Sequence, residues 1–217
     1  MSTRTLMIYS RFERFWHWAQ MTLIFLLMFS GFAIHGLHEM IGFYSAVKLH
    51  TGSAVALIVL WLFAIFWHLT TGNWRHYMPT TNGLWRVARF YAFGIFKGEH
   101  HPYRKAYWRK HNPLQALAYL ALKLALFPAV WLSGLAYLGY NLWDETPGAA
   151  DWLTVVAVIH TLSAFAILAF VIAHVYLLTT GHSFREHVKP MITGYDEVDL
   201  NEAEEAYLQE SPTARMK

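Results

Sequence analysis

The stretch IHTLSAFAILAFVIAHVY, residues 159–176, determines the architecture that we predict. It is an apolar run with His160 near one end and His174 near the other. Fourteen residues of α-helix rise about 21 Å and turn about 1400°, close to four full turns, so both imidazoles lie on nearly the same face. Histidine inside a lipid-spanning helix is costly and usually has a specific partner. Two histidines on one face at different depths therefore predict two stacked metal or haem sites.

The composition is that of a small polytopic membrane protein. The chain has 217 residues, of which 56% are hydrophobic, 17% aromatic and only 14% charged. It has no cysteine, which excludes disulfides, thiolate nucleophiles, iron–sulfur clusters held by this chain and covalently attached c-type haem. A redox metal must therefore be held by His, Met or carboxylate groups. No long basic run with interleaved aromatic residues suggests a nucleic-acid partner.

Hydropathy predicts an all-α integral membrane protein, a four-helix transmembrane bundle. The spans are expected at about residues 15–36, 47–69, 114–137 and 152–179. Within the long basic loop 70–112, the segment 84–96 (LWRVARFYAFGIF) is expected to be a helix lying in the cytoplasmic headgroup region. Residues 1–195 form one predicted membrane domain with no visible internal repeat. An acidic cytoplasmic tail, 196–217, follows and is expected to be a solvated helix or disordered.

The distribution of basic residues predicts the orientation. Four spans put both termini on one side of the membrane. Of the 17 Lys and Arg residues, all but Lys48 and Lys123 belong to the terminal segments and the 70–112 loop on that side. The positive-inside rule therefore places both termini in the cytoplasm.

This topology sorts four histidines by depth. His17 lies just inside the cytoplasmic edge of the first span, and His174 lies at a matching depth in the fourth. His50 enters the second span from the outer edge, and His160 begins the fourth span at that level. Paired imidazoles at matched depth on different helices are what six-coordinate b-type haem needs.

A small metal site and simple helix packing are two other uses of such histidines. Two neutral imidazoles alone make a poor structural zinc site, and neither level offers cysteine or an obvious carboxylate. Haem tolerates two protein ligands because the porphyrin supplies the other four. Simple hydrogen bonding between helices would explain one buried histidine, but it explains four at two matched levels poorly.

Six segments within roughly residues 8–195 carry a resemblance to a known family: RFERFWHWAQ around His17, VKLHTG around His50, LWRVARFYAF, KHNPLQ, the spaced pair IH…AHVY, and MITGY. Through them the chain resembles the bacterial b561-like di-haem cytochrome b subunits of membrane-bound nickel–iron hydrogenases and the related gamma subunits of respiratory formate dehydrogenase. The resemblance implies a location in the bacterial inner membrane.

The resemblance implies two haem b groups and a quinone site. His50 and His160 would bind the outer haem, which takes electrons from an iron–sulfur partner; His17 and His174 would bind the inner haem, which passes them to a quinone. The family's quinone motif corresponds to Asn112 and Gln115. Asn112 before Pro113 is equally typical of a helix N-cap with proline at the first helical position, and both roles can hold together.

Several polar groups remain outside these pairs. His68 lies five helical turns after His50 on the same face and is interpreted as an interfacial residue near a haem propionate or the quinone, with ligation of the inner haem as the rival. Lys123 lies at a depth where an ammonium is expensive, and it can snorkel, pair with a propionate or serve protonation. A solvated surface position is expected for the other histidines: His35, His38, His76, His100, His101, His111, His182 and His187.

We therefore expect a membrane-anchoring di-haem b cytochrome subunit of a quinone-linked oxidoreductase complex. It would transfer electrons between a periplasmic iron–sulfur subunit with its catalytic partner, hydrogenase- or formate-dehydrogenase-like, and the membrane quinone pool. The donor chemistry belongs to the partners, and the short outer loops 37–46 and 139–151 are the expected docking surface. Two alternatives remain: a free-standing b561-like quinone reductase with a small diffusible donor, and a quinol-oxidising subunit of a periplasmic thiosulfate- or tetrathionate-type reductase.

Overall fold

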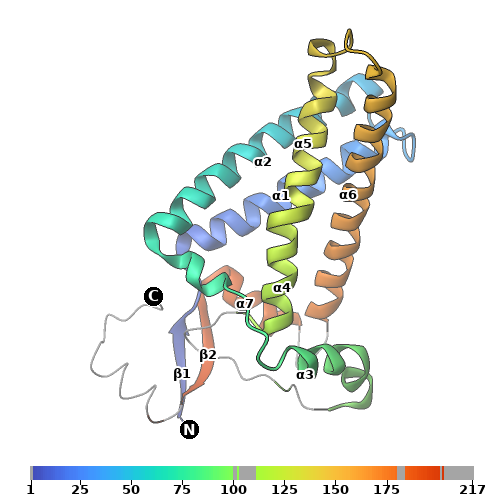
Figure 1. Cartoon of the computed structure of the whole chain (residues 1–217). Helices are drawn as coiled ribbons and strands as arrows, with labels where there is room; N and C mark the ends of the chain where they lie inside the picture. The colour runs from blue at the N-terminus through green and yellow to red at the C-terminus, as the bar shows by residue number, and fades with distance from the viewer. Residues whose placement is uncertain (1, 100–101, 103–110, 180–183, 201, 203–217) are drawn as a thin grey trace. The chain divides into compact units, whose positions relative to one another are not determined.

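The computed structural model describes residues 2–99, 102, 111–179, 184–200 and 202 (Figure 1). The helices of these parts are α1 (Arg11–Ile34), α2 (Phe43–Thr71), η1 (Asn73–Tyr77), α3 (Leu84–Arg89), η2 (Phe90–Gly94), η3 (Ile95–Lys97), α4 (Pro113–Ala121), η4 (Leu122–Leu126), α5 (Phe127–Leu138), η5 (Tyr140–Leu142), α6 (Ala149–Leu178) and α7 (Phe184–Thr193). The strands are β1 (Ser2–Met7) and β2 (Tyr195–Leu200).

Within the described residues, four helices are long and apolar enough to cross a membrane. They are Arg11–Ile34, Phe43–Thr71, Pro113–Leu138 and Ala149–Leu178. The predicted helical membrane protein with four spans is therefore confirmed, and the chain is a multi-pass membrane protein. Each observed helix begins one to four residues before the predicted span.

The third span is not a regular α-helix, since α4 and α5 are joined by the π-helical turn η4. Pro128 follows this turn within α5. Proline has no N–H to donate to the carbonyl four residues earlier, and its ring crowds that carbonyl. A π-turn before the proline relieves this conflict. Lys123 lies inside the turn.

The chain divides into two compact units, and several helices contribute residues to both. The first, unit 1, comprises Met1–His17, Ala64–Leu120 and Tyr176–Lys217; the second, unit 2, comprises Trp18–Phe63 and Ala121–Val175. Each unit is described by itself below.

Unit 2 consists of packed segments of α1, α2, α5 and α6. The buried Trp61 of α2 meets Phe127 and Trp131 edge-on, with ring centroids 5.1 and 4.8 Å apart. Its indole Nε1 donates a hydrogen bond to Gln20 Oε1 of α1 at 3.2 Å. Buried tryptophan needs such a partner for its N–H. This one side chain therefore links three helices.

Large apolar side chains cover the outside of unit 2. On α2, Val59 and Leu62 are about 60% exposed, and Leu132 of α5 and Leu162 of α6 are equally open. A water-soluble protein rarely exposes so continuous an apolar surface. In a membrane these apolar side chains face lipid, whereas the few buried serines and histidines of the spans lie inside the unit.

Unit 1 contains a two-stranded antiparallel sheet in which Ser2 pairs with Leu200 and Met7 with Tyr195 (Figure 1). Ile8, Val198 and Leu200 form its small buried core. The expectation of a solvated helix or disordered segment is therefore wrong for Asp196–Leu200, because alternate residues of this acidic stretch are apolar and buried. The predicted boundary at residue 195 falls inside β2; residues 201 and 203–217 lie outside the described residues.

Gly194 joins α7 to the sheet and explains the MITGY segment. Its φ is +92°, a conformation that residues with a Cβ rarely adopt. Its carbonyl accepts hydrogen bonds from the backbone N–H groups of Ile8 and Tyr9 at 2.8 and 3.1 Å. A Cβ at this position would lie 2.8 Å from the Tyr9 carbonyl oxygen. Glycine is therefore required where the two ends of the membrane domain meet.

Two spans begin with reciprocal capping boxes. At α1, Ser10 N–H donates to Glu13 Oε2 at 2.8 Å, and Glu13 N–H donates to Ser10 Oγ at 3.2 Å. At α4, Asn112 N–H donates to Gln115 Oε1 at 3.1 Å, and Gln115 N–H donates to Asn112 Oδ1 at 2.9 Å. Backbone donors at a helix start have no intrahelical partner, so these side chains satisfy them.

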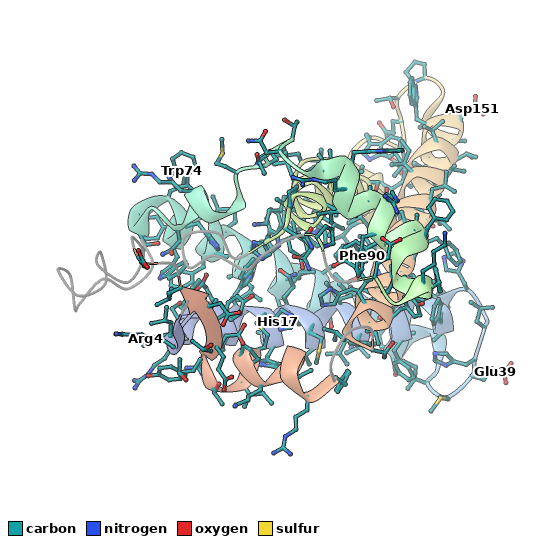
Figure 2. The ribbon with its side chains drawn as sticks, turned by 90° about the horizontal axis from the view of Figure 1, so that it is seen from below. Arg4, His17, Glu39, Trp74, Phe90 and Asp151 are labelled. Atoms are coloured by element: carbon teal, nitrogen blue, oxygen red, sulfur yellow. The ribbon has the colours of Figure 1, made fainter. Side chains whose placement is uncertain are left out.

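The loop after α2 forms the expected helix, continuous over α3, η2 and η3. It buries Val87 and Phe90 and exposes Trp85 and Phe93. Figure 2 shows Phe90 on this helix and Trp74 projecting from η1. An apolar exposed face beside arginines suits the headgroup region of a bilayer. Residues 100–101 and 103–110 of the loop lie outside the described residues.

Candidate haem site

Unit 2 brings the imidazole rings of His50 of α2 and His160 of α6 close together, in an edge-on arrangement. Their ring centroids lie 6.2 Å apart at an interplanar angle of 66°. Both side chains are half-buried. The two residues lie 110 positions apart in the chain, so only the tertiary structure makes them neighbours. They are the two residues that the depth argument assigns to the outer level.

A serine–glycine pair on α5 holds the His160 ring. His160 Nδ1 lies 3.0 Å from the Val130 carbonyl oxygen and 3.2 Å from Ser133 Oγ. A Cβ on Gly134 would lie only 3.0 Å from Cε1 of this ring. Since a carbonyl oxygen can only accept, Nδ1 of His160 carries the proton.

A second serine–glycine pair, on α1, holds the His50 ring in the same way. Ser30 Oγ lies 3.1 Å from His50 Nδ1, and its own hydroxyl donates to the Leu26 carbonyl at 2.6 Å. Because the single hydroxyl proton is used on Leu26, the oxygen accepts from Nδ1–H of His50. A Cβ on Gly31 would lie 3.5 Å from Cε1 of His50.

The expectation that the chain has no internal repeat is wrong at this site. The motif Ser-Gly-x-Ala occurs at 30–33 and at 133–136, and the motif His-Thr-x-Ser-Ala-x-Ala occurs at 50–56 and at 160–166. In each half the serine–glycine helix holds the histidine of the following helix. Our sequence reasoning missed Ser30, Gly31, Ser133 and Gly134, although comparing the flanks of His50 and His160 reveals both repeats.

The two imidazoles fit a haem iron by their spacing and by their protonation. Two rings bound to one metal through bonds of about 2 Å place their centres roughly 6 Å apart. Holding the proton on Nδ1 leaves the Nε2 lone pair of each ring available as a metal ligand. Two neutral imidazoles as the protein's donor set also suit a porphyrin, which supplies the other four ligands.

The predicted inner ligands belong to different units. His17 lies on α1 at the end of the first segment of unit 1, and its side chain is half-buried (Figure 2). His174 lies on α6 in unit 2, where its ring stacks on Phe170 one turn earlier, with centroids 5.9 Å apart. The pairing of His17 with His174 stays a prediction.

His68 is enclosed by aromatic rings of unit 1, and its place near a haem propionate or the quinone stays a prediction. Its side chain is 8% exposed and meets Trp16 and Trp67 edge-on, with centroids 5.2 and 5.1 Å apart. Its Nδ1 donates to the Ala64 carbonyl one turn back, at 2.6 Å. A local partner for Nδ1 explains how the helix accommodates this histidine.

Asn112 and Gln115 lie together at the start of α4. Their capping box confirms the N-cap interpretation, with Pro113 at the first helical position. Asn112 is 5% exposed and also donates from Nδ2 to the Tyr91 hydroxyl at 3.3 Å. Burial raises the pKa of the Tyr91 phenol, which therefore stays protonated at neutral pH. The quinone role of the two amides stays a prediction.

Some of the other histidines also have specific places. His38 is half-buried, its Nε2 donates to the Phe29 carbonyl at 2.8 Å, and its ring stacks on Phe29. His111 meets Tyr119 edge-on at 4.9 Å. The expected solvated position is therefore wrong for these two and right for His35, which is exposed. His100, His101 and His182 lie outside the described residues.

Comparison with known proteins identifies the family of this chain. A family model described as prokaryotic cytochrome b561 matches residues 8–194. The chain is 36% identical over 196 residues to the Escherichia coli (strain K12) protein named "Putative cytochrome YdhU", which covers 87% of this chain and 73% of that protein. No solved structure is significantly similar. The chain therefore belongs to the prokaryotic cytochrome b561 family, whose members are membrane cytochromes that bind haem b.

Proposed function

We propose that this chain is the membrane-anchoring di-haem b subunit of a quinone-linked oxidoreductase complex, related to the cytochrome subunits of nickel–iron hydrogenase or formate dehydrogenase. It carries electrons between a periplasmic iron–sulfur partner and the membrane quinone pool. The observation that carries the proposal is the opposed His50–His160 pair, with each Nδ1 held by a serine of a neighbouring helix.

His50 and His160 bind the outer haem, and His17 and His174 bind the inner one. A haem held by each pair would supply one-electron chemistry. Because two histidines would bind each iron, these residues favour electron transfer over reaction with oxygen.

The quinone site lies at the start of α4. A quinone needs hydrogen-bond donors for its carbonyls and a route for protons. Here the Tyr91 phenol holds its proton, and Gln115 has amide hydrogens besides the Oε1 that caps α4. Because Asn112 already donates to the Tyr91 oxygen, it orients the phenol so that the O–H can point elsewhere.

The quinone role can be separated from the capping role by a conservative change. Gln115→Glu keeps an oxygen to accept the Asn112 N–H but removes the amide donors, and Tyr91→Phe removes the phenol. We expect both to raise KM for quinone while haem content stays at the wild-type level. An unchanged KM for quinone in both variants would contradict the quinone role, and Asn112 and Gln115 would then only cap α4.

The outer loops form the docking surface for the iron–sulfur partner. Five large apolar side chains there are between 66% and 85% exposed: Leu37, Met40, Phe43, Tyr44 and Leu142. Acidic groups, including Asp144 and Glu145, lie in the same connections. The ammonium of Lys48 sits 4.4 Å from the centre of the Tyr44 ring, in a cation–π contact beside these apolar side chains. An apolar patch with a charged rim is typical of a protein interface.

Both termini lie on the cytoplasmic side of the inner membrane. The pairing of β1 with β2 supports a common side, because strands that share backbone hydrogen bonds cannot lie across a bilayer from each other. The positive-inside bias of the connecting loops supports the cytoplasm. A fluorescent reporter fused to the C-terminus should therefore fold and fluoresce, whereas a periplasmic alkaline phosphatase fusion at that position should be inactive.

Haem content per chain tests the central claim. We expect two b haems in the purified wild type and one in His50→Ala and in His160→Ala. His35→Ala is the matched control, since this exposed histidine interacts electrostatically with both rings, and it should retain two. One haem or none in the wild type, or two in His160→Ala, contradicts the di-haem assignment.

Purification in mild detergent separates the proposal from its alternatives. The subunit should bring an iron–sulfur protein and a hydrogen- or formate-oxidising activity that reduces quinone. A chain that reduces quinone alone with a small diffusible donor would be free-standing. Reduction of thiosulfate or tetrathionate by quinol would instead identify the outward-running complex.

A further inference from the structure

Two serines meet the proposed outer ligands from opposite halves of unit 2. Ser30 of α1 faces Nδ1 of His50 at 3.1 Å, and Ser133 of α5 faces Nδ1 of His160 at 3.2 Å. Both side chains are buried, at 0% and 6% exposure. Neither histidine relies on its own helix for this contact, since each serine comes from the helix before it.

Each hydroxyl is oriented by its own helix. Ser30 donates to the Leu26 carbonyl at 2.6 Å, and Ser133 donates to the Ala129 carbonyl at 2.5 Å. A hydroxyl has one proton and two acceptor sites. With the proton committed one turn back, the oxygen presents only lone pairs to the imidazole, and it therefore accepts Nδ1–H in both halves.

This arrangement affects the electron density of the ring. An acceptor on the outer N–H of a metal-binding imidazole fixes its orientation and raises the basicity of the other nitrogen. A more basic Nε2 stabilises the oxidised, more positive iron relative to the reduced one. Inside a bilayer the low dielectric strengthens the contact, because water cannot compete for the N–H.

The same serine–imidazole contact occurs twice, on different helices. A chance contact does not explain this repetition. A buried serine has no packing advantage over alanine in an apolar helix, and its carbonyl bond one turn back is available wherever serine stands. Besides this carbonyl bond, Ser30 and Ser133 share two features: an imidazole within hydrogen-bonding distance and a glycine as the next residue.

We propose that Ser30 and Ser133 are positioning residues that hold the two outer-haem ligands and lower the midpoint potential of that haem. The proposal rests on the proposed ligation of the outer haem by His50 and His160. Each hydroxyl contributes separately, because the two serines lie on different helices and contact different rings.

Potentiometric titration of the haem absorbance tests this in the purified full chain. The outer haem is assigned as the titration step that disappears in His160→Ala. Ser30→Ala and Ser133→Ala should each make the outer midpoint more positive, and the double variant should shift it by about the sum. The inner midpoint and the two-haem content should stay as in the wild type.

Two matched controls lie on the ligand-bearing helices. Ser53 and Ser163 are buried serines three residues after His50 and His160, at 6% and 8% exposure. Among the hydrogen bonds of the described residues, neither hydroxyl contacts an imidazole. Ser53→Ala and Ser163→Ala remove the same atoms from equally buried sites, and they should leave both midpoints unchanged.

The outcomes separate this inference from the proposed function. An unchanged outer midpoint in both Ser30→Ala and Ser133→Ala, or equal shifts in the two controls, overturns the inference while the loss of one haem in His160→Ala still supports ligation. If an alanine variant loses the outer haem, the corresponding threonine variant decides. If the threonine variant keeps the outer haem at the wild-type midpoint potential, the result supports a role for the hydroxyl. If the threonine variant also loses the outer haem, the inference is overturned.

Discussion

The two glycines beside the outer ligands offer a matched pair of substitutions that differ only in clearance. In Gly134→Ala the new Cβ would lie 3.0 Å from Cε1 and 3.3 Å from Nδ1 of His160. In Gly31→Ala the corresponding distances to His50 are 3.5 and 3.7 Å. Ordinary carbon contacts are about 3.5–4.0 Å, so only the first variant forces the imidazole to move by several tenths of an ångström.

The expected magnitude follows from overpacking. Adding a methyl group to a filled site costs about 1–3 kcal/mol, whereas replacing glycine by alanine inside a helix stabilises it by roughly 0.5–1 kcal/mol. The helix term is common to both variants and cancels in their comparison. Since about 1.4 kcal/mol corresponds to a factor of ten, Gly134→Ala should bind the outer haem roughly 5- to 100-fold more weakly than Gly31→Ala.

The assay is titration of the haem-depleted chain with haem, followed by absorbance, together with the haem content of the purified variants. Gly31→Ala should reach wild-type saturation at the outer site. Gly134→Ala should need a higher haem concentration to saturate the outer site, and it should lose haem more easily in detergent. Equal affinities in the two variants would refute the argument that His160 is held against Gly134.

Three further predictions concern residues of unit 1. Gly194→Ala places a Cβ 2.8 Å from the Tyr9 carbonyl oxygen, at a φ of +92°. This variant should therefore lower the midpoint of thermal unfolding and expose the β1–β2 sheet to protease. Gly52→Ala is the control and should do neither, because its Cβ would have no atom within 4 Å. Asn112→Ala should cost about 1 kcal/mol of stability through the lost cap, measured by thermal unfolding, and Asn112→Asp should retain most of it. Burial raises the pKa of Tyr9 above its usual 10.0, so the folded chain keeps a proton that the unfolded chain loses. Stability should therefore fall as pH rises above 10.0 and fall less steeply in Tyr9→Phe; equal alkaline slopes would contradict this.

Much of the site lies within reach of sequence reasoning because it depends on depth. A histidine's distance from the end of an apolar run gives its level in the bilayer, since every residue of a helix rises by the same amount. The level comparison selected His50 and His160, and unit 2 brings their rings together. It gives no information about which face of one helix meets which face of another.

The serine–glycine pairs that hold His50 and His160 show what such reasoning misses. Ser30 and Ser133 read as ordinary small residues of a membrane helix, and their contacts to Nδ1 come from helices that cross at those points. The repeated motifs were visible in the sequence, but only the structure explains why the repeats include both a hydroxyl and a glycine.

The acidic stretch after residue 195 shows a second limit. Its charge suggested a solvated segment, yet Val198 and Leu200 alternate with Asp and Glu and are buried against Ile8. Strand pairing between the two ends of a chain depends on contacts that are remote in sequence, which local composition does not reveal.

The sequence by itself determined the four apolar spans, the absence of thiol chemistry and the levels of the candidate ligands, because hydropathy and helix rise are local properties. The tertiary structure decided which imidazoles face each other, that Nδ1 carries their protons, that Asn112 and Gln115 cap a helix, and that β1 pairs with β2. These depend on the packing of distant segments, since a hydrogen bond or a van der Waals contact requires positions accurate to a few tenths of an ångström.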